Sequence, residues 1–294
     1  MMTGQIRKKK RRSHHEQNTN KIDRTTIQRA CKSLSKQGKT RFCVSNITSQ
    51  GIQLHSLLAT YGLPMGAITN WRKSRFRKKE ICYSAVYHHF SKWSHDNSLN
   101  TLWKNSILTI RDDLNFSELN LDGSHTFAKK GGESVAYQGR KKGKTCNILP
   151  ITESNGFIVS STGIIAGNHN DAYHLKSHLQ SAFKEMKRMG LPIVGAYFNA
   201  DMAFDTKKAR KTCFNHGLIP NTPENKRNRK GTKRGRKRLF NEEVYKRRFC
   251  AERTFAWIDK YKRLLIRFER QDACFLGAHH IAFSMINLRN ILSD

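Results

Sequence analysis

Three acidic residues that lie far apart in the sequence are candidates to hold divalent cations: Asp122, Asp201 and Glu252. Asp122 and Asp201 each follow a strand-like run, and ligands of α/β sheets gather at the carboxyl ends of strands. Hard cations such as Mg²⁺ prefer carboxylate oxygens. Glu252 falls within a helical pattern that can lie across those strands. The set therefore suits two-metal phosphodiester chemistry, in which one cation activates a water or a 3′-hydroxyl and the other stabilises the leaving oxygen.

Each acid taken singly has a simpler explanation. An aspartate at a strand end is usually a cap or turn residue, and a helical glutamate four positions from an arginine is usually one half of a surface ion pair. The order strand-Asp, strand-Asp, helix-Glu within one very basic chain favours the catalytic interpretation over these.

Basic and aromatic residues near the acids are candidate DNA contacts. Tyr245, Arg248 and Lys260 lie at near-helical spacing from Glu252, broadly on one side of the predicted helix. A second group forms a cationic stretch after the first strand and comprises Lys129, Lys130, Arg140, Lys141 and Lys142. Contacts of this kind position DNA without reading its sequence. A charged loop that faces only solvent is the alternative.

The composition points to a polyanionic partner. The chain has 294 residues and a formal net charge of +33, from 55 Lys+Arg against 22 Asp+Glu. A surface this positive attracts a phosphate backbone and releases its counterions. We find no basic amphipathic helix, lipidation site or long apolar run that would favour a membrane role. Seven cysteines without a CxxC pair indicate a reducing compartment, so we expect a cytoplasmic, nucleoid-associated protein.

The hydrophobic periodicity divides the chain into three parts. Residues 1–40 are polar and cationic, and they form either a disordered arm along DNA or a solubilising tail. Residues 41–114 show helical spacing, which suits either a small DNA-contacting module or a bundle that supports the next domain. Residues 115–294 alternate between strand-like and helix-like segments and form the predicted catalytic domain.

The third part predicts a mixed sheet with helices on its faces. One expected strand ends at Asp122, and the other expected strands cover 145–152, 157–165, 193–201 and 218–222. Its expected helices cover 171–189 with Asn170 as the cap, 206–216, 241–264 and 276–292. A basic segment, 223–238, is too polar to pack and is expected to be a mobile loop.

The sequence resembles bacterial insertion-sequence transposases of the DDE class, in particular the branch typified by insertion sequence five. The resemblance covers about residues 50–290. Its motifs are Leu121-Asp-Gly-Ser-His-Thr, Gly167-Asn-His-Asn-Asp, Asn199-Ala-Asp and Ala251-Glu-Arg-Thr-Phe-Ala-Trp-Ile-Asp-Lys-Tyr-Lys-Arg-Leu. The most specific of these is similar to the family's Tyr, Arg, Glu, Lys helix, here Tyr245, Arg248, Glu252 and Lys260.

The resemblance implies an RNase H-like catalytic domain with two Mg²⁺ or Mn²⁺ ions per site. It also implies cleavage and strand transfer at terminal inverted repeats, with target DNA as a second partner and a homo-oligomer assembled on DNA. Two alternatives stay open at this stage. One is a related metal-dependent endonuclease that does not join strands, and the other is a DNA-binding derivative without catalytic activity.

Overall fold

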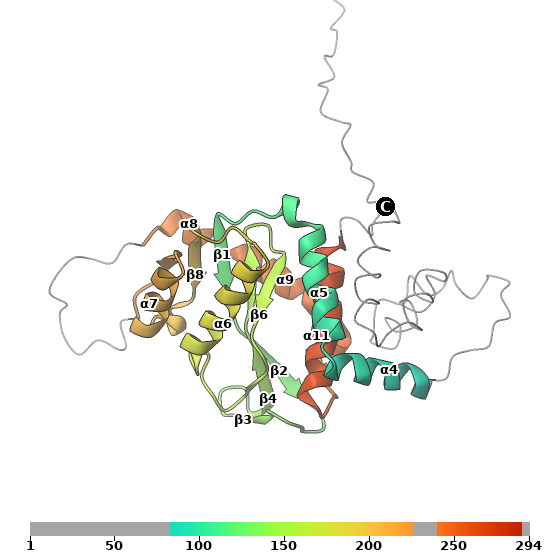
Figure 1. Ribbon diagram of the computed structural model, residues 1–294. Helices are drawn as coiled ribbons and strands as arrows, with labels where there is room; N and C mark the ends of the chain where they lie inside the picture. Colours follow the sequence, from blue (N-terminus) through green and yellow to red (C-terminus); the bar gives the residue numbers. More distant parts are fainter. Residues whose placement is uncertain (1–82, 226–239, 290–294) are drawn as a thin grey trace, which may run out of the picture. The chain divides into compact units, whose positions relative to one another are not determined.

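The computed structural model describes residues 83–225 and 240–289 (Figure 1). The predicted arm at 1–40, most of the predicted helical module, and most of the predicted basic loop lie outside the described residues. Because of this, the domain boundaries at 40 and 114 stay predictions. Within the two described ranges, no helix is both long enough and apolar enough to cross a membrane.

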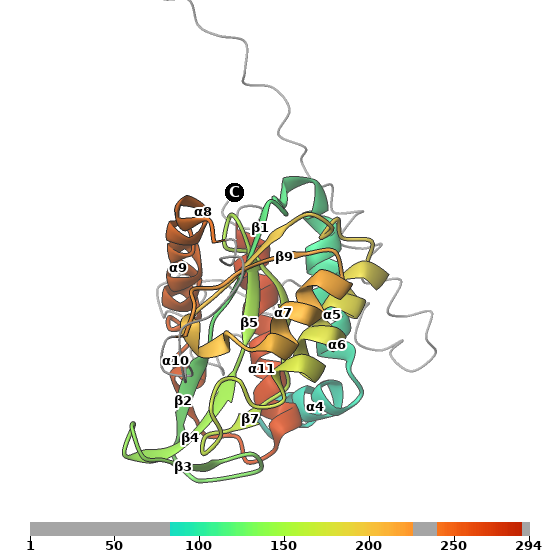
Figure 2. The ribbon, with the colours of Figure 1, turned by 90° about the vertical axis from the view of Figure 1, so that its left-hand side faces the viewer.

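The strands form two sheets that have no strand in common. The first has the order β6-β5-β1-β8-β9 and the second the order β10-β2-β4-β3, with β7 also paired to β4. The chain passes from the first sheet to the second between β1 and β2, and back between β4 and β5 (Figure 2). Strand bounds are β1 Glu118–Leu121, β2 Ser124–Ala128, β3 Ala136–Gln138, β4 Gly143–Ile148, β5 Pro150–Glu153, β6 Ile158–Ser161, β7 Ile165–Ala166, β8 Tyr197–Ala200, β9 Ile219–Asn221 and β10 Ile266–Arg267.

The first sheet is mixed. β1 pairs antiparallel with β5 and parallel with β8, which in turn pairs parallel with β9. Helices α6 (Leu175–Arg188) and α7 (Lys207–Asn215) lie on one side of the strands in Figure 1, and α11 (Asp272–Asn287) lies on the other. Helices α4 (Tyr83–His95) and α5 (Ser98–Thr109) pack on α11. A mixed sheet flanked by helices confirms the α/β fold class that the sequence predicts.

The two faces of β1 and β8 differ in chemistry, because successive side chains of a strand point to opposite faces. Phe198 of β8 packs edge-on against Phe183 of α6, with 5.3 Å between ring centroids. The alternate positions carry Asn120 and Asn199, which are fully buried. One face of the sheet is therefore apolar and faces α6, while the other face is polar.

Helix α6 confirms most of the prediction for 171–189. Leu175, Leu179, Phe183 and Met186 are buried at helical spacing, and Gly190 (φ 71°) ends the helix. The predicted cap at Asn170 is wrong, because the helix begins four residues later.

The late start of α6 has a local cause. The carboxylate of Asp171 is held by His125 and Asn147, and the ring of His169 stacks on Tyr173 with 3.6 Å between centroids. These contacts hold 169–173 in a turn, and His174 then adopts a left-handed conformation (φ 48°) before the first helical residue.

The single predicted helix at 241–264 is wrong. Three helices occupy this stretch: α8 (Glu242–Lys246), α9 (Phe249–Ile258) and α10 (Lys262–Leu265). Between α8 and α9 the backbone tightens into i→i+3 hydrogen bonds, from Arg248 N to Tyr245 O at 3.0 Å and from Ala251 N to Arg248 O at 2.9 Å. The two helices therefore form one nearly continuous segment, residues 241–258, which we call the α8–α9 segment.

The last helix starts earlier than predicted. Helix α11 begins at Asp272 instead of 276, and the backbone N–H of Asp272 donates to the Glu133 carboxylate at 2.8 Å. A distant side chain thus satisfies one of the free N–H groups of the first turn. Residues 290–292 of the prediction lie outside the described residues.

Candidate active site

Asp122 and Asp201 directly follow two neighbouring parallel strands. In the pairing of β1 with β8, Leu121 lies opposite Ala200, which is the last paired position of both strands. The next residue of each strand is an aspartate. The strand register therefore places the two carboxylate-bearing residues side by side at one edge of the first sheet, as the sequence predicts for ligands at strand ends.

Each aspartate uses one carboxylate oxygen locally. Asp122 Oδ1 accepts from the backbone N–H of Gly123 at 2.9 Å, and Asp201 Oδ1 accepts from that of Met202 at 2.6 Å. Asp201 in this way caps a short 3₁₀ helix, Met202–Phe204. The cap explanation weighed for a strand-end aspartate is thus correct for Asp201, and it leaves the second oxygen available for another partner.

Arg248 joins the α8–α9 segment to the first aspartate. Its Nη1 donates to Asp122 Oδ2 at 3.0 Å, and the two side chains are 18% and 28% exposed. Burial lowers the pKa of the guanidinium, but the carboxylate of Asp122, with a further contribution from Asp201, outweighs burial and raises it above its usual value. Arg248 is therefore a permanent cation between the two strand ends.

Tyr245 lies beside Arg248. The Arg248 guanidinium carbon is 5.7 Å from the centre of the tyrosine ring. Burial raises the pKa of the Tyr245 phenol, and the negative charges of Asp201 and Asp122 act in the same direction, while Arg248 opposes them. The phenol stays protonated at neutral pH and can donate a hydrogen bond. The structure thus brings four of the predicted residues together: Asp122, Asp201, Tyr245 and Arg248.

Glu252 lies one helical turn after Arg248 in α9, and its side chain is exposed. Further along the same side of this helix, Phe255 and Asp259 line a cavity with Ser124, which follows Asp122 by two positions. Glu252 therefore lies between two points at which α9 approaches the start of β2. Among the described residues, no three His, Cys, Asp or Glu side chains are grouped closely enough to hold a metal ion.

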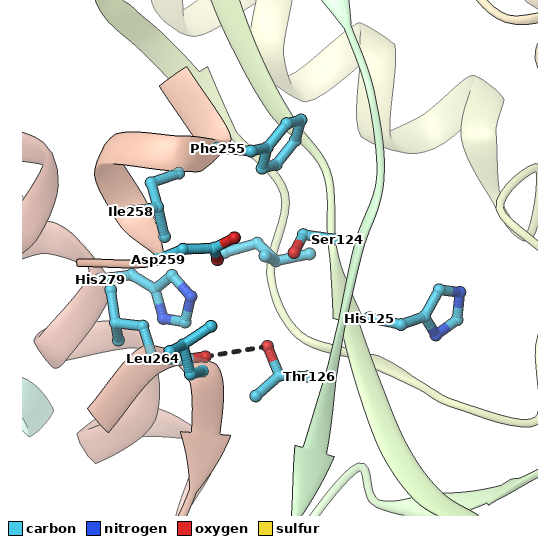
Figure 3. A pocket seen from close by; sticks show the side chains of 10 residues that line it. Ser124, His125, Thr126, Phe255, Ile258, Asp259, Leu264 and His279 are labelled. Carbon is cyan, nitrogen blue, oxygen red and sulfur yellow. Dashed lines mark hydrogen bonds between the residues drawn. The ribbon is translucent and has the colours of Figure 1, made fainter. Parts of the chain in front are cut away.

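The cavity beyond Asp122 has a volume of about 50 Å³. Figure 3 shows Ser124 and Thr126 on the cavity side of β2, while the His125 ring turns to the opposite side of the strand. Thr126 donates from Oγ1 to the carbonyl oxygen of Leu264 at 3.2 Å. This volume suits water molecules, each of which occupies roughly 30 Å³ in the liquid, and it is too small for a nucleotide.

Two other acids of the first sheet have structural roles. Glu153 is fully buried and accepts from three backbone N–H groups, those of Asn115, Asn155 and Phe157. Glu118 pairs with Arg247 at 2.5 Å. Burial raises the pKa of both carboxyls. Their oxygens already have partners, so neither replaces Glu252 as a candidate third ligand.

The predicted phosphate contacts occupy different places. All five residues of the cationic stretch are exposed, in the loop after β2 and in the turn between β3 and β4. That turn lies at the opposite end of the molecule from α8 (Figures 1 and 2). Lys260 is exposed in the turn after α9 ends at Ile258. Helical spacing therefore no longer places Lys260 beside Arg248 and Glu252, and its role stays a prediction.

A second polar cluster lies near Gly123. Asp171 Oδ1 is 3.2 Å from His125 Nε2 and accepts from Asn147 Nδ2 at 2.8 Å. The hydrogen bond from His125 lowers the pKa of Asp171. His125 and Asn147 are opposite each other on β2 and β4. The cluster is on the side of β2 away from the cavity and fixes the chain just after Asp122.

The donor set of the site fits a divalent cation in part. Asp122 and Asp201 supply the hard oxygen ligands that Mg²⁺ and Mn²⁺ prefer, at adjacent positions. Arg248 already contacts Asp122, so a cation near this carboxylate shares it with the guanidinium. The third acid, Glu252, lies outside any close group of ligands in the described residues.

A protein-family model described as "Transposase DDE domain" matches residues 198–289. The matched segment runs from β8 to α11, so it includes Asp201, Arg248 and Glu252. This match supports a DDE transposase. Among curated proteins, none matches the sequence.

Several solved transposase structures are similar at low sequence identity. A piggyBac transposase synaptic complex with hairpin DNA is 11% identical with a TM-score of 0.45; the alignment covers 83% of this chain and 64% of the piggyBac chain. A Mos1 mariner paired-end complex with Mn is 10% identical with a TM-score of 0.32, over 96% of this chain and 81% of that one. The Mos1 catalytic domain is 9% identical with a TM-score of 0.29, over 74% and 98%.

Proposed function

We propose that the protein is a DDE transposase that cuts and joins DNA at the terminal inverted repeats of an insertion sequence, within the branch typified by insertion sequence five. Asp122, Asp201 and Glu252 hold two divalent cations, Mg²⁺ or Mn²⁺. The observation that carries the proposal is the placement of Asp122 and Asp201 after paired residues of parallel strands, with Arg248 of the α8–α9 segment on Asp122. The family match across β8 to α11 supports it.

The chain's own residues supply position and charge. A bound divalent cation activates a water or a 3′-hydroxyl and stabilises the leaving oxygen. The strand register holds the two aspartates in place before DNA arrives, which reduces the reorganisation needed for the reaction. Arg248, cationic and half-buried, and Tyr245, protonated, can both donate hydrogen bonds to a phosphate next to the carboxylates.

Glu252 completes the site by a local movement. The side chain is exposed and unbranched, and its helix approaches Asp122 at Arg248 and Ser124 at Asp259. We expect the Glu252 carboxylate to turn toward Asp122 when a divalent cation binds, because the cation would bring positive charge to this edge of the sheet.

Double-stranded DNA is the partner that the charge favours. The formal net charge of +33 supports electrostatic binding to a phosphate backbone. The exposed cationic turn between β3 and β4 lies at the other end of the molecule from α8, so one DNA duplex contacting both would run along the second sheet (Figure 2). A homo-oligomer on paired DNA ends is also part of the proposal.

The test uses the purified full chain and a duplex that contains the DNA flanking its own gene. With Mg²⁺, we expect nicking at the end of an inverted repeat. Asp122→Asn and Glu252→Gln each reduce nicking at least about a hundredfold, since a metal ligand contributes several kcal/mol of transition-state stabilisation. Glu243→Gln is the matched control, because Glu243 is an exposed glutamate of α8.

The outcome separates the three candidate functions. Joining of a pre-cut 3′-hydroxyl end to target DNA identifies a transposase, and Mg²⁺-dependent nicking without joining identifies an endonuclease. Binding without nicking, or nicking that survives Glu252→Gln at the wild-type rate, overturns the proposal.

A further inference from the structure

Three buried asparagines lie side by side on the polar face of the first sheet. Asn120 of β1 is opposite Asn199 of β8, and Asn199 is opposite Asn221 of β9. Their exposed fractions are 0%, 0% and 1%. We call these three residues the asparagine row. Asn120 and Asn199 lie two positions before Asp122 and Asp201, and side chains alternate along a strand, so the row lies on the same face as the two aspartates.

The amide groups of the row bond to one another. Asn199 Nδ2 donates to Asn120 Oδ1 at 2.9 Å, and Asn221 Nδ2 donates to Asn199 Oδ1 at 2.8 Å. None of the buried polar atoms that lack a partner in the described residues belongs to the row. Burying an amide is costly unless it is hydrogen-bonded, so a fully satisfied row has one strongly preferred arrangement.

One end of the row binds the start of α8. Asn221 Oδ1 accepts from the backbone N–H of Asn241 at 2.8 Å, and Asn221 Nδ2 donates to the Asn241 carbonyl at 3.0 Å. Asn241 is the cap of α8, and its own side chain accepts from Val244 N at 3.1 Å. The row thus fixes the residue from which the α8–α9 segment begins.

The rest of the row binds the segment on both sides of Arg248. Asn120 Nδ2 donates to Cys250 Sγ at 3.2 Å. Asn199 Nδ2 contacts Glu118 Oε2 at 3.3 Å, and Glu118 in turn pairs with Arg247 at 2.5 Å. The row therefore binds Asn241 and Cys250 directly, and it reaches Arg247 through Glu118. These three positions lie on both sides of Arg248, and all of them come before Glu252.

We propose that the asparagine row positions the α8–α9 segment over the two aspartates, so that Arg248 and Glu252 keep a fixed location relative to Asp122 and Asp201. The inference rests on the proposed function for its catalytic meaning. The three asparagines are positioning residues, because they act through the segment that they hold. A row that served only the stability of the sheet would have no need for bonds to Asn241 and Cys250.

The test compares two matched substitutions. Asn221→Leu keeps the approximate volume of the side chain and removes both bonds to Asn241. Asn287→Leu is the control, because Asn287 of α11 is equally buried at 1% and makes the same two bonds, with the backbone N–H and carbonyl of Ile158, each at 3.0 Å. Both variants lose two bonds to backbone groups, but the control loses them at Ile158 of β6 and keeps the bonds to the cap of α8.

The first measurement is amide hydrogen exchange of the full chain below its unfolding temperature. Asn221→Leu raises exchange in residues 241–258 at least about tenfold, because local opening no longer has to break these bonds. Asn287→Leu raises exchange in α11 and β6 and leaves 241–250, the part of the segment that the row binds, protected. Equal exchange in 241–250 for the two variants overturns the proposal.

The second measurement is the Mg²⁺ concentration that gives half-maximal nicking. It rises in Asn221→Leu and stays at the wild-type value in Asn287→Leu, although both variants lose thermal stability. If Asn221→Leu fails to fold, Cys250→Val replaces it, with Cys250→Ser as the conservative variant that keeps an acceptor for Asn120. Hydrogen exchange does not depend on catalysis. A wild-type protein that never cuts DNA would overturn the proposed function, and the exchange data would still show whether the asparagine row holds the α8–α9 segment.

Discussion

The guanidinium of Arg248 donates to the carboxylate of Asp122 at 3.0 Å, although 126 positions separate the two residues in the chain. This ion pair joins the start of α9 to the end of β1. Both side chains are less than a third exposed. Breaking it from one side leaves a partly buried charge without its partner, which is more costly than removing both charges together.

The first prediction concerns this pair. Arg248→Met lowers the free energy of unfolding by about 1.5–3 kcal/mol, the range for hydrogen bonds to charged groups. The double variant Asp122→Asn with Arg248→Met is more stable than the sum of the single effects predicts. Urea denaturation of the four proteins gives the coupling energy. Additive effects would show that the pair contributes nothing to stability.

The second prediction separates the two roles of Asp201. Asp201→Asn keeps an oxygen for the Met202 N–H and removes the charge, whereas Asp201→Ala removes both. We expect both variants to lose nicking to a similar extent. Only Asp201→Ala should lose stability as well, by about 1 kcal/mol, the usual cost of a lost cap. Nicking by Asp201→Asn at the wild-type rate would reduce Asp201 to a cap residue.

The third prediction concerns acid stability. Burial lowers the pKa of His279 to about 4 and that of His280 to about 3. In the unfolded chain both rings take up protons below about pH 6.5, while the folded protein keeps them neutral. The unfolded state therefore binds more protons, and stability falls as the pH drops from about 6.5 toward 4, by about 1.4 kcal/mol per pH unit for each histidine.

His280→Gln tests whether a buried neutral histidine causes the loss of stability at low pH. The loss of thermal stability between pH 7 and pH 4.5 should be smaller in this variant than in the wild type, as measured by calorimetry. His88→Gln is the control, because His88 is exposed on α4. An equal loss in His280→Gln and the wild type would contradict the assignment of a neutral buried ring.

The fourth prediction concerns the turn between β3 and β4. Replacing Arg140, Lys141 and Lys142 by glutamine lowers DNA affinity and reduces the slope of log K against log salt by about 0.9 for each phosphate that the variant no longer neutralises. The matched control replaces three exposed lysines of α7, namely Lys207, Lys208 and Lys211. If the control reduces the slope and the turn variant leaves it unchanged, DNA follows the α7 surface instead.

The position of the two aspartates at strand ends could be predicted from the sequence, because each follows a run of buried strand residues, a local pattern. The sequence could not predict that Leu121 lies opposite Ala200, since the pairing of β1 with β8 depends on contacts across 79 positions, as between Asn120 and Asn199. The asparagine row was missed for the same reason. An asparagine two positions before each aspartate, inside an otherwise apolar run, was the available indication.

The break between α8 and α9 was missed for a different reason. Tyr245, Arg248 and Glu252 keep helical spacing through the break, because i→i+3 turns rotate the chain almost as an α-helix does. The sequence pattern therefore looks continuous. The late start of α6 depends on His125 and Asn147, which lie on other strands and leave no trace in the local pattern around Asn170.

The distance along the chain between Asp122 and Arg248 has a consequence for protein synthesis. A ribosome that has made the first 240 residues has already produced both aspartates and β9, but neither Arg248 nor Glu252. Such a nascent chain can bind DNA through its basic residues and still lacks the third acid. Under the proposed function, a product that terminates before residue 252 lacks the third acid and cannot cut DNA.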